Sequence, residues 1–525
     1  MNAPLARTID ARGLWIGAAA VVWIVCGALY LTLPPNGDQF VLGYAGWRTL
    51  AGDVPYVDFV DMNWPGVYWL HAAAVALFGS ELWSWRAFDL LLLALVSPVA
   101  ADLAKRSGGA LAARVLWIAL PLFYVGLNNR SSGQPDVVAG ELALASIWLH
   151  VRSIERSDVR WQLGAGALLG AAMLCKPTLV VVAPLAALHL LWLRTPLRSA
   201  LAHVASLGVG AIAMLLAAVG CLLLQGAGLA AIADATIVYN AQTQFDEAAG
   251  LQALARTWAV LHLDSWWILS ALAAVGWVWT WREAPRGAGA GALPLVWIAG
   301  VLSFALQRRG FLYHLGPCLV PLVGLASVAV GKALTPGVTR SLAPGVRGAR
   351  AALAAGCAAL ALVCIGGVVK LRANYGSLVP ALQRDDYAIH LRSFKRQDGL
   401  SLDEVVALAQ RIERDVPPGE AVLTLGMTSA VNFLAERAQP TRFFYAPVLV
   451  HLRPDMPMHD RWVASFARDL ARTPPRICLI SRPIRERWFA RGGAMARVLS
   501  AVLSRDYVRT GSLGENGAFE VYEPR

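Results

Sequence analysis

Charged side chains are scarce in this sequence. Asp, Glu, Lys and Arg make up 15% of its 525 residues, whereas hydrophobic residues make up 57% and include 20 Trp. So few charges do not suit a soluble protein of this length, and the composition indicates an integral membrane protein packed against lipid. The formal net charge of +12 fits the excess of Lys and Arg in the cytoplasmic loops of such proteins, so we assign no nucleic acid partner.

Cysteine is also rare, and its spacing excludes two kinds of site. The sequence has 7 Cys and no CxxC pair, so neither a disulfide framework nor a zinc site is expected. Most of the cysteines lie in or beside apolar segments, and Cys478 lies in a short strand pattern where a core role is predicted. The polar C-terminal region contains no GxGxxG or Walker pattern, and no solenoid repeat is evident.

Long apolar runs occupy most of the first 371 residues. The run at 14–33 has about 20 uncharged residues, enough to cross about 30 Å of hydrocarbon at about 1.5 Å per residue. Further runs lie near 85–103, 109–127, 137–151, 162–175, 177–193, 199–224, 263–281, 290–307, 314–333 and 351–371. The pattern predicts a polytopic α-helical membrane protein with about eleven transmembrane helices.

The loop charges indicate how the chain is oriented. The apolar segment 66–79 is only about fourteen residues long, which favours an interfacial or re-entrant helix over a crossing. If it does not cross, the basic loops around Lys105, Arg152, Arg194, Arg282 and Lys332 all lie in the cytoplasm, as does the N-terminus. Residues 34–84, 128–136, 226–262, 308–313 and the chain after 371 then lie on the external face.

The region after residue 371 has a different composition. It is polar and rich in Arg, with short β-type runs in VLTLGM, RICLIS and AFEVYE and a helical pattern in LDEVVALAQRIERDV. We predict a transmembrane domain at 1–371, with its first external loop at 34–84, and a soluble α/β domain at 372–525.

Several acidic residues follow the first apolar run. Asp38 lies directly after it, with Asp53, Asp58 and Asp61 close behind. A carboxylate at the edge of the hydrocarbon is partly desolvated, which raises its basicity and lets it take a proton from an acceptor hydroxyl. A solvated loop carboxylate is the structural alternative.

Asp136, in RSSGQPD, is a second external carboxylate at the start of a predicted helix. It could divide the base and orienting roles with Asp38, or the two could share a divalent metal ion. Helix capping is the structural alternative, because a negative charge at a helix start is stabilised by the helix dipole.

Basic residues also occur where the loop-charge rule does not expect them. Arg308 and Arg309, in QRRGFLYH, lie on the predicted external face, where a lipid phosphate is a natural partner. Interfacial snorkelling is the alternative. Lys176, in LCKPT, lies between two apolar segments and needs water or an anion. If those segments form a hairpin, Lys176 is at its external tip.

The order of these motifs resembles a known family. Asp38 after the first helix, GDVPYVDFVDMNWPGVYWLHAAAVALFG, QPD before a helix, GALLGAAMLCKPT and RRGFLYHLGPCLVPL are similar to the GT-C glycosyltransferases related to protein O-mannosyltransferases and lipid A aminoarabinose transferases. The resemblance covers about residues 10–335 and implies juxtamembrane helices in the first external loop. Two positions depart from the family pattern: Gln39 stands where many relatives have Glu, and Trp64-Pro65 stands where many have Pro-Pro.

The resemblance implies an inverting transfer of a sugar from a polyprenyl phosphate to an acceptor at the non-cytoplasmic face. It implies that Asp38 is the catalytic base or orienting carboxylate and that Asp136 is its helper. The residues implied to neutralise the donor phosphate are Lys176, Arg308, Arg309 and His314, and those implied to line the substrate pocket are Asp58 and Tyr313. No cofactor is certain, and a divalent metal ion could take part.

The sequence therefore predicts a multi-pass glycosyltransferase of the bacterial inner membrane. Its predicted partners are membrane lipids, a polyprenyl-phosphate sugar donor and a surface glycan, lipid or protein acceptor. A lipid-linked glycan transporter and a noncatalytic subunit that binds a lipid phosphate are the alternatives. A transporter favours polar groups near the bilayer midplane, whereas here the unusual charges cluster at one face. The sequence names neither the sugar nor the acceptor.

Overall fold

A computed structural model describes residues 11–243, 251–252, 254–255, 266–283, 287–335, 369–394, 399–426, 429–490 and 493–525. In the described residues before 336, all the regular elements are helices. These elements include α1 (Ala11–Leu31), α2 (Gly37–Leu50), α3 (Pro65–Phe78), α4 (Ser84–Val125), α5 (Pro135–Arg156), α6 (Val159–Cys175), η1 (Pro177–Val181), α7 (Val182–Trp192), α8 (Leu197–Leu224), α9 (Leu229–Ala233), η2 (Asp234–Val238), α10 (Tyr239–Thr243), α12 (Trp266–Glu283), α13 (Ala292–Gln307), η3 (Leu312–Cys318) and α14 (Leu319–Ala333). The predicted run at 351–371 lies almost wholly outside the described residues.

Among the described residues, five helical stretches are long and apolar enough to cross a membrane. They are Gly13–Leu31, Ser84–Val125, Pro135–Arg156, Leu197–Leu224 and Leu312–Ala333. Shorter apolar helices at α6, η1 with α7, and α13 pack among them. Two predicted runs form the single element α4, which bends at Gly109 where φ is 82°. The prediction of a polytopic helical membrane protein is confirmed.

The first external loop contains two short helices. α2 begins with a capping box, in which the Asn36 side chain accepts from the Gln39 N–H and the Gln39 side chain accepts from the Asn36 N–H. α3 is the segment predicted not to cross, and its 14 residues span only about 21 Å. The two helices pack so closely that a Cβ at Gly46 would lie 2.6 Å from His71.

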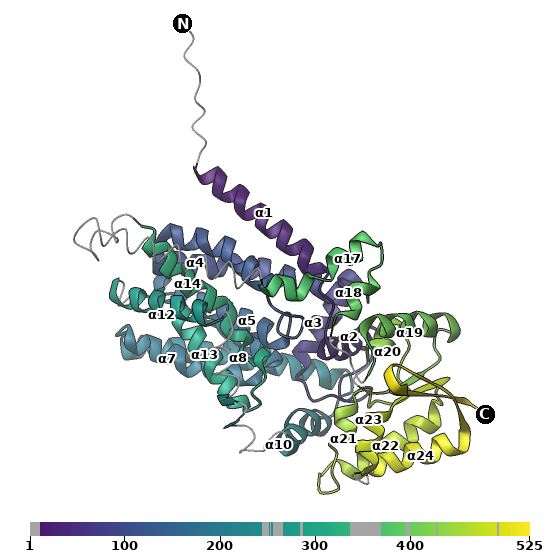
Figure 1. Ribbon diagram of the computed structural model, residues 1–525. Helices are drawn as coiled ribbons and strands as arrows, with labels where there is room; N and C mark the ends of the chain where they lie inside the picture. The colour runs from purple at the N-terminus through teal and green to yellow at the C-terminus, as the bar shows by residue number, and fades with distance from the viewer. Residues whose placement is uncertain are drawn as a thin grey trace.

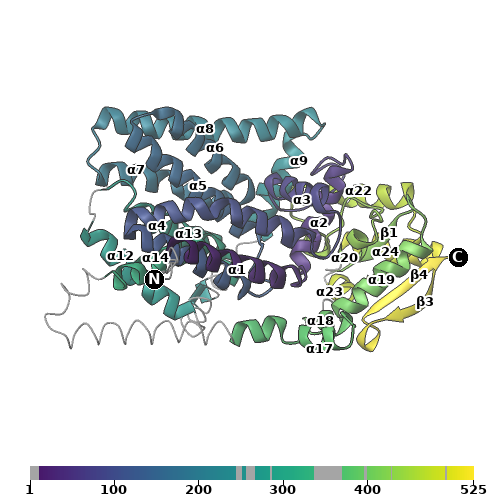
Figure 2. The same ribbon diagram turned by 90° about the horizontal axis from the view of Figure 1, so that it is seen from above.

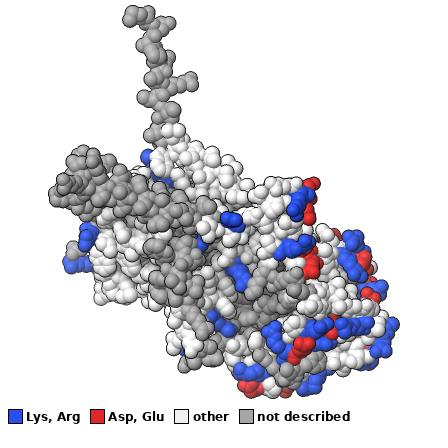
Figure 3. Space-filling view, viewed as in Figure 1, with Lys and Arg blue, Asp and Glu red and all other residues white. Residues whose placement is uncertain are grey.

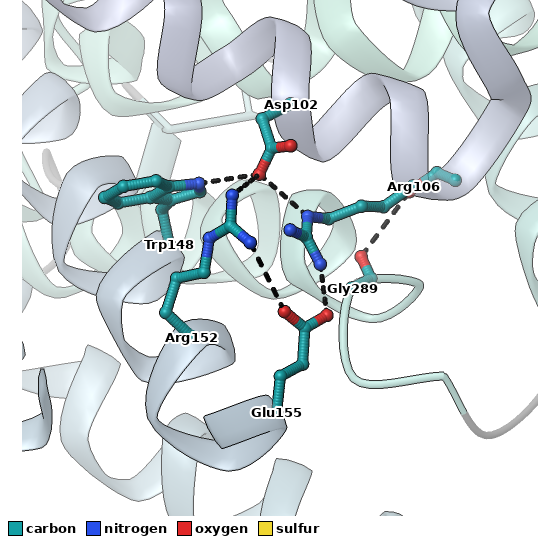
Figure 4. A network of polar contacts seen from close by, with 7 residues as sticks. Asp102, Arg106, Trp148, Arg152, Glu155 and Gly289 are labelled. Carbon is teal, nitrogen blue, oxygen red and sulfur yellow. Dashed lines mark hydrogen bonds and ion pairs between the residues drawn. The ribbon is translucent and has the colours of Figure 1, made fainter. Parts of the chain in front are cut away.

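A charged network joins α4 to the far end of α5, away from the start of that helix (Figure 4). Asp102 accepts from Arg106 Nε at 2.7 Å, from Trp148 Nε1 at 2.8 Å and from Arg152 at 3.1 Å. Glu155 pairs with both arginines. Asp102 therefore holds helices together at the end that the loop charges assign to the cytoplasm.

The C-terminal part contains a four-stranded sheet with helices around it. Its elements are α17 (Leu378–Gln383), α18 (Ala388–Arg392), α19 (Leu402–Asp415), β1 (Val422–Leu425), α20 (Ser429–Leu434), α21 (Ala446–Val450), α22 (His459–Arg472), β2 (Ile477–Ser481), α23 (Arg482–Ala490), α24 (Ala494–Asp506), β3 (Tyr507–Leu513), η4 (Glu515–Gly517) and β4 (Phe519–Pro524). The strand order is β1-β2-β4-β3, with β1 parallel to β2 and the other pairs antiparallel. Three of these strands are the predicted β-type runs, whereas β3 was not predicted.

The C-terminal part lies beside one end of the helix bundle, next to α2 and α3 (Figures 1 and 2). The contact is direct, because α2 packs against α20. Charged side chains gather over the C-terminal part, while the visible bundle surface is mostly uncharged (Figure 3). A bundle with so few charges on its surface suits a hydrocarbon environment.

Candidate functional site

An ion pair joins the start of α5 to the end of α6. Asp136 lies in the first turn of α5, where the helix dipole stabilises a carboxylate. Lys176 follows the last residue of α6, and its Nζ lies 3.0 Å from both carboxylate oxygens of Asp136. The Asp136 side chain is 2% exposed and that of Lys176 is 20% exposed. The ammonium is therefore held by a buried carboxylate while part of the lysine side chain remains accessible.

Residues of α13 fix the same pair from another side. Gln307, the last residue of α13, donates from Nε2 to Asp136 at 3.3 Å. The hydroxyls of Thr178 and Ser303 are hydrogen-bonded at 2.7 Å, which joins η1 to α13. The helix is interrupted at Lys176, between α6 and η1. The segment that follows this interruption thus packs against α13.

Close backbone contacts place η3 against the start of α5. A Cβ at Gly316 would lie 2.7 Å from the backbone nitrogen of Val137, and a Cβ at Gly140 would lie 2.4 Å from Cα of Pro317. Glycine at both positions allows this approach, since any larger residue would force the backbones apart. The contact brings His314 of η3 to the end of α5 that carries Asp136.

His314, Arg309 and Tyr313 extend the group around Lys176. His314 is 5% exposed, and its Nδ1 has no hydrogen-bond partner among the described residues. It interacts electrostatically with Lys176 and Arg309. Burial lowers the pKa of the Arg309 guanidinium from its usual value, an effect that the nearby Tyr313 and Tyr239 oppose. Tyr313 packs edge-on against His314, with ring centroids 4.6 Å apart.

Asp38 lies in the first turn of α2 and is partly buried. Burial raises the pKa of its carboxyl group, the charge of Asp61 raises it further, and Arg130 and Lys176 oppose these effects. Asp61 is fully buried, and burial likewise raises its pKa. One oxygen of Asp61 accepts from Asn63 Nδ2 at 2.7 Å and from the Tyr68 hydroxyl at 3.0 Å, while the other has no partner in the described part of the chain.

A buried arginine fixes the loop that carries Asp38 against the loop that carries Asp136. Arg86 has an exposed fraction of 0%. Its guanidinium donates to the carbonyls of Leu33, Pro34, Ser132 and Asn129 and to the Gln39 side chain at 2.8 Å. Gln39 also donates to the Ser132 carbonyl at 2.6 Å. The residue that departs from the family pattern is therefore a buried link between the two loops.

The predicted site residues fall into two groups. Asp38, Asp136, Lys176, Arg309, Tyr313 and His314 come together at one end of the bundle. Arg308, by contrast, is exposed at the end of α13. Asp58 is also exposed, and its carboxylate accepts from the Val54 N–H at 2.8 Å within the loop. Its place in the acidic part of the site is taken by Asp61.

The Lys176 ammonium lies where the predicted metal ion would contact Asp136. The described residues contain no group of three or more His, Cys, Asp or Glu that could hold a metal ion. The Lys176 ammonium lies against both oxygens of Asp136, where a shared cation would bind. The Asp136 carboxylate is thus arranged to hold the Lys176 ammonium.

Sequence reasoning missed three residues that build the site. Asp61 was noted only as a neighbour of Asp38, and Arg86 was not noted. Tyr445 belongs to the C-terminal part, and the charges of Asp38 and Asp61 act on its hydroxyl. An arginine just after the start of α4, directly after Trp85, was a usable signal, because Arg is costly in an apolar helix unless it is paired. Nothing in the sequence around Tyr445 points to the membrane part.

The arrangement has a cationic side and an acidic side. Lys176, Arg309 and His314 suit a phosphate, because charge-assisted hydrogen bonds to anions are strong. Asp38 and Asp61, with several tyrosines around them, form the other side. A site of this kind can hold an anionic leaving group on one side of a reacting carbon and a base on the other.

Both the sequence and the fold are similar to those of known proteins. Residues 62–222 match the family model described as dolichyl-phosphate-mannose-protein mannosyltransferase. The crystal structure of ArnT from Cupriavidus metallidurans bound to undecaprenyl phosphate is similar, with a TM-score of 0.58, 15% identity and 98% coverage of both chains. Its apo state gives a TM-score of 0.54 and 15% identity over 97% of both chains.

A more distant structure shares the fold. The Archaeoglobus fulgidus oligosaccharyltransferase tethered with an acceptor peptide gives a TM-score of 0.50 and 12% identity, over 97% of this chain and 74% of that one. No curated protein matches the sequence. The matched segment 62–222 contains Arg86, Asp136 and Lys176. The resemblance stated from the motifs is confirmed.

Proposed function

We propose that this chain, which has the GT-C fold and is related to the protein mannosyltransferase and ArnT group, transfers a sugar from a polyprenyl phosphate to an acceptor hydroxyl. The observation that carries this proposal is the Asp136–Lys176 pair, held at 3.0 Å beside Arg309 and His314 and within electrostatic reach of Asp38. The similar fold of ArnT, crystallised with undecaprenyl phosphate, supports a lipid phosphate as donor.

In this proposal the cationic side binds the donor phosphate. Lys176 and Arg309 neutralise its charge, and His314 donates a hydrogen bond from the ring nitrogen that has no partner among the described residues. Neutralisation also makes the phosphate a better leaving group, because charge that develops on its oxygen is stabilised. Asp136 and Gln307 act as positioning residues that hold the Lys176 ammonium. Arg308, which is exposed, contributes long-range electrostatic attraction for the donor phosphate.

Asp38 acts as the base on the opposite side of the reacting carbon. Its carboxylate takes the proton of the acceptor hydroxyl as the acceptor oxygen attacks the anomeric carbon of the sugar. The bond between that carbon and the phosphate oxygen breaks, and polyprenyl phosphate leaves with the electron pair. Attack from the face opposite the leaving group inverts the anomeric configuration. The raised pKa of Asp38 makes it a stronger base than an ordinary carboxylate.

We further propose that the chain has about eleven transmembrane helices in a bacterial inner membrane. The N-terminus lies in the cytoplasm, and residues 372–525 form a periplasmic domain. The loop charges support this orientation. The highly charged surface of the C-terminal part suits an aqueous domain outside the bilayer (Figure 3). The acceptor is a surface glycan, a lipid or a protein that reaches the site from the periplasm.

The test is complementation of a strain that lacks the gene, followed by mass analysis of envelope glycans and glycolipids. Wild-type protein restores a missing sugar. Asp38→Asn does not restore it, although the protein accumulates normally. Asp53→Asn is the matched control in the same loop, because Asp53 forms a partly exposed pair with Arg48 at 2.7 Å, worth about 0–1 kcal/mol.

Two results contradict the proposal. Restoration by Asp38→Asn excludes a base role and favours a noncatalytic subunit that binds a lipid phosphate. An unchanged envelope, together with lipid-linked sugar that accumulates on the cytoplasmic side of the deletion strain, favours a transporter.

A further inference from the structure

A tyrosine from the C-terminal part borders the acidic side of the site. Tyr445 precedes α21, far along the chain from the membrane helices. Burial raises the pKa of its hydroxyl, and the charges of Asp38 and Asp61 raise it further. Tyr313 and Tyr239 act on the same hydroxyl. Tyr445 therefore lies among residues of the first external loop, η3 and α10.

The chain around Tyr445 is fixed to the first external loop by its neighbours. The Val60 N–H donates to the Arg442 carbonyl at 2.8 Å, and the Gln439 N–H donates to the Tyr44 hydroxyl at 2.8 Å. Phe444 packs on Tyr44, with ring centroids 4.8 Å apart, and on Phe59 at 5.9 Å. Residues 439–445, which we name the clamp segment, thus have a defined position over α2 and the loop that follows it.

The neighbours of Tyr445 show which side of the reaction it faces. Tyr313 interacts with Asp136 and Arg309 as well as with Asp38, so it lies between the cationic and acidic sides. Tyr445 interacts with Asp38, Asp61 and Tyr313, and the charges of Asp38 and Asp61 are the strongest of these influences on its hydroxyl. Tyr445 therefore lies beside the two carboxylates of the acidic side, which is the side from which the acceptor attacks in the proposed reaction.

A groove open to solvent lies beside the clamp segment, and Arg442 of that segment lines it. It has a volume of about 520 Å³ and runs between the first external loop, at Tyr56 and Val60, and α22, at Trp462 and Ser465. Contacts join one wall of the groove to the acidic side, because the Tyr56 ring contacts Tyr68, which donates to Asp61. On the other wall, Trp462 stacks on Tyr239, with ring centroids 6.0 Å apart.

We propose that the clamp segment forms the acceptor wall of the site and that Tyr445 is a specificity-determining residue for a saccharide acceptor. This inference rests on the proposed function. Tyrosine rings offer flat apolar faces to the C–H faces of a sugar, while the carboxylates accept hydrogen bonds from its hydroxyls. The groove holds the part of the acceptor that does not react, so the C-terminal part helps to select the acceptor.

The test measures transfer by the purified full-length protein. The donor is the pool of lipid-linked sugars labelled metabolically with radioactive glucose, and the acceptor is a dilution series of envelope from the deletion strain. For Tyr445→Ala we expect the apparent KM for the envelope fraction to rise about tenfold, which corresponds to about 1.4 kcal/mol and lies within the range of an aromatic ring contact. Binding of undecaprenyl phosphate should change less than twofold. Tyr445→Phe, which keeps the ring, should raise the KM less than Tyr445→Ala.

Matched variants separate acceptor recognition from general damage. Tyr522→Ala removes a partly exposed tyrosine of the same part of the chain, on β4 and away from the clamp segment, and should leave the KM unchanged. Protease treatment of the product should leave the label on a saccharide. If the Tyr445→Ala protein does not fold, the same measurement is made with Tyr445→Leu, which keeps apolar volume at this position.

Three results overturn the inference. An unchanged KM in both Tyr445→Ala and Tyr445→Leu shows that the ring does not contact the acceptor. Loss of undecaprenyl phosphate binding in step with transfer assigns Tyr445 to the donor side. Label that protease releases as glycopeptide shows a protein acceptor. If the wild-type protein transfers no sugar at all, the proposed function itself fails, which differs from transfer with an unchanged KM.

Discussion

Asp38 is the residue on which the proposed chemistry depends most, and its surroundings make its protonation testable. Burial and the charge of Asp61 raise its pKa. A base acts only when deprotonated, so the transfer rate should fall as pH drops through this raised pKa, above the usual carboxylate range.

Asp61→Asn separates the two causes of the raised pKa. It removes a neighbouring negative charge, which lowers the pKa of Asp38 and moves the acidic limb of the pH–rate profile to lower pH. The hydrogen bonds from Asn63 and Tyr68 still have an oxygen to accept them. Initial rates measured across pH for both proteins test this. An acidic limb that stays in place or moves to higher pH contradicts the assignment of Asp38 as the titrating base.

The two adjacent arginines should differ in donor binding. Arg309 is partly buried beside Tyr313, whereas Arg308 is exposed. Arg309→Ala should weaken undecaprenyl phosphate binding at least about tenfold, as expected for a charge-assisted hydrogen bond. Arg308→Ala should weaken it less than about threefold, because an exposed charge is screened. Titration of both variants in one detergent measures the difference, and equal losses would place the phosphate outside the group around Lys176.

At the scale of single residues, the sequence predicted those site residues that stand out by their residue type and their position next to an apolar run. Asp136 and Lys176 could be singled out because a charge beside an apolar run needs a partner, and each is indeed the partner of the other. Asp58 and Asp61 could not be told apart, because the exposure of a loop carboxylate depends on how the loop folds. Tyr445 could not be found, since its role depends on a contact between distant parts of the chain.

At the scale of elements, the buried Arg86 fixes two external loops relative to each other. Arg86→Lys keeps the charge but loses the planar fork that reaches Gln39 and the loop carbonyls. Because buried carbonyls lose their donors, we expect the free energy of unfolding to fall by roughly 2–3 kcal/mol. Transfer should fall as well, because Asp38 and Asp136 are no longer fixed relative to each other.

Thermal unfolding in detergent and transfer rates at a temperature below both transitions measure the two effects. Arg48→Lys, in the partly exposed pair with Asp53, is the matched control and should change neither. Wild-type stability and transfer in Arg86→Lys would show that the loops are held by other contacts.

Helices of the bundle were easier to predict than the elements outside it. Apolar length alone marked most of the described bundle helices, and the fourteen residues of α3 match the predicted short segment. Helix α2 is only weakly apolar and followed only from the family resemblance. Strand β3 escaped prediction because it lies at the edge of the sheet with mostly exposed residues and so lacks an apolar pattern.

At the scale of the whole molecule, the site is assembled from parts that are distant in sequence. The bundle supplies Lys176, Asp136 and Arg309, the first external loop supplies Asp38 and Asp61, and the C-terminal part covers that loop through the clamp segment. Composition predicted a membrane bundle and a polar C-terminal region. It could not predict that the two meet over the first external loop, because such a contact depends on tertiary packing.

The most direct test of the central claim is release of polyprenyl phosphate from a lipid-linked sugar by the purified protein, measured with and without the envelope fraction. The account predicts that wild-type protein releases polyprenyl phosphate in proportion to the sugar transferred. It predicts that Asp38→Asn is about 100- to 10,000-fold slower, although it still binds undecaprenyl phosphate. Release by Asp38→Asn at the wild-type rate, or recovery of the lipid-linked sugar intact with wild-type protein, would contradict it.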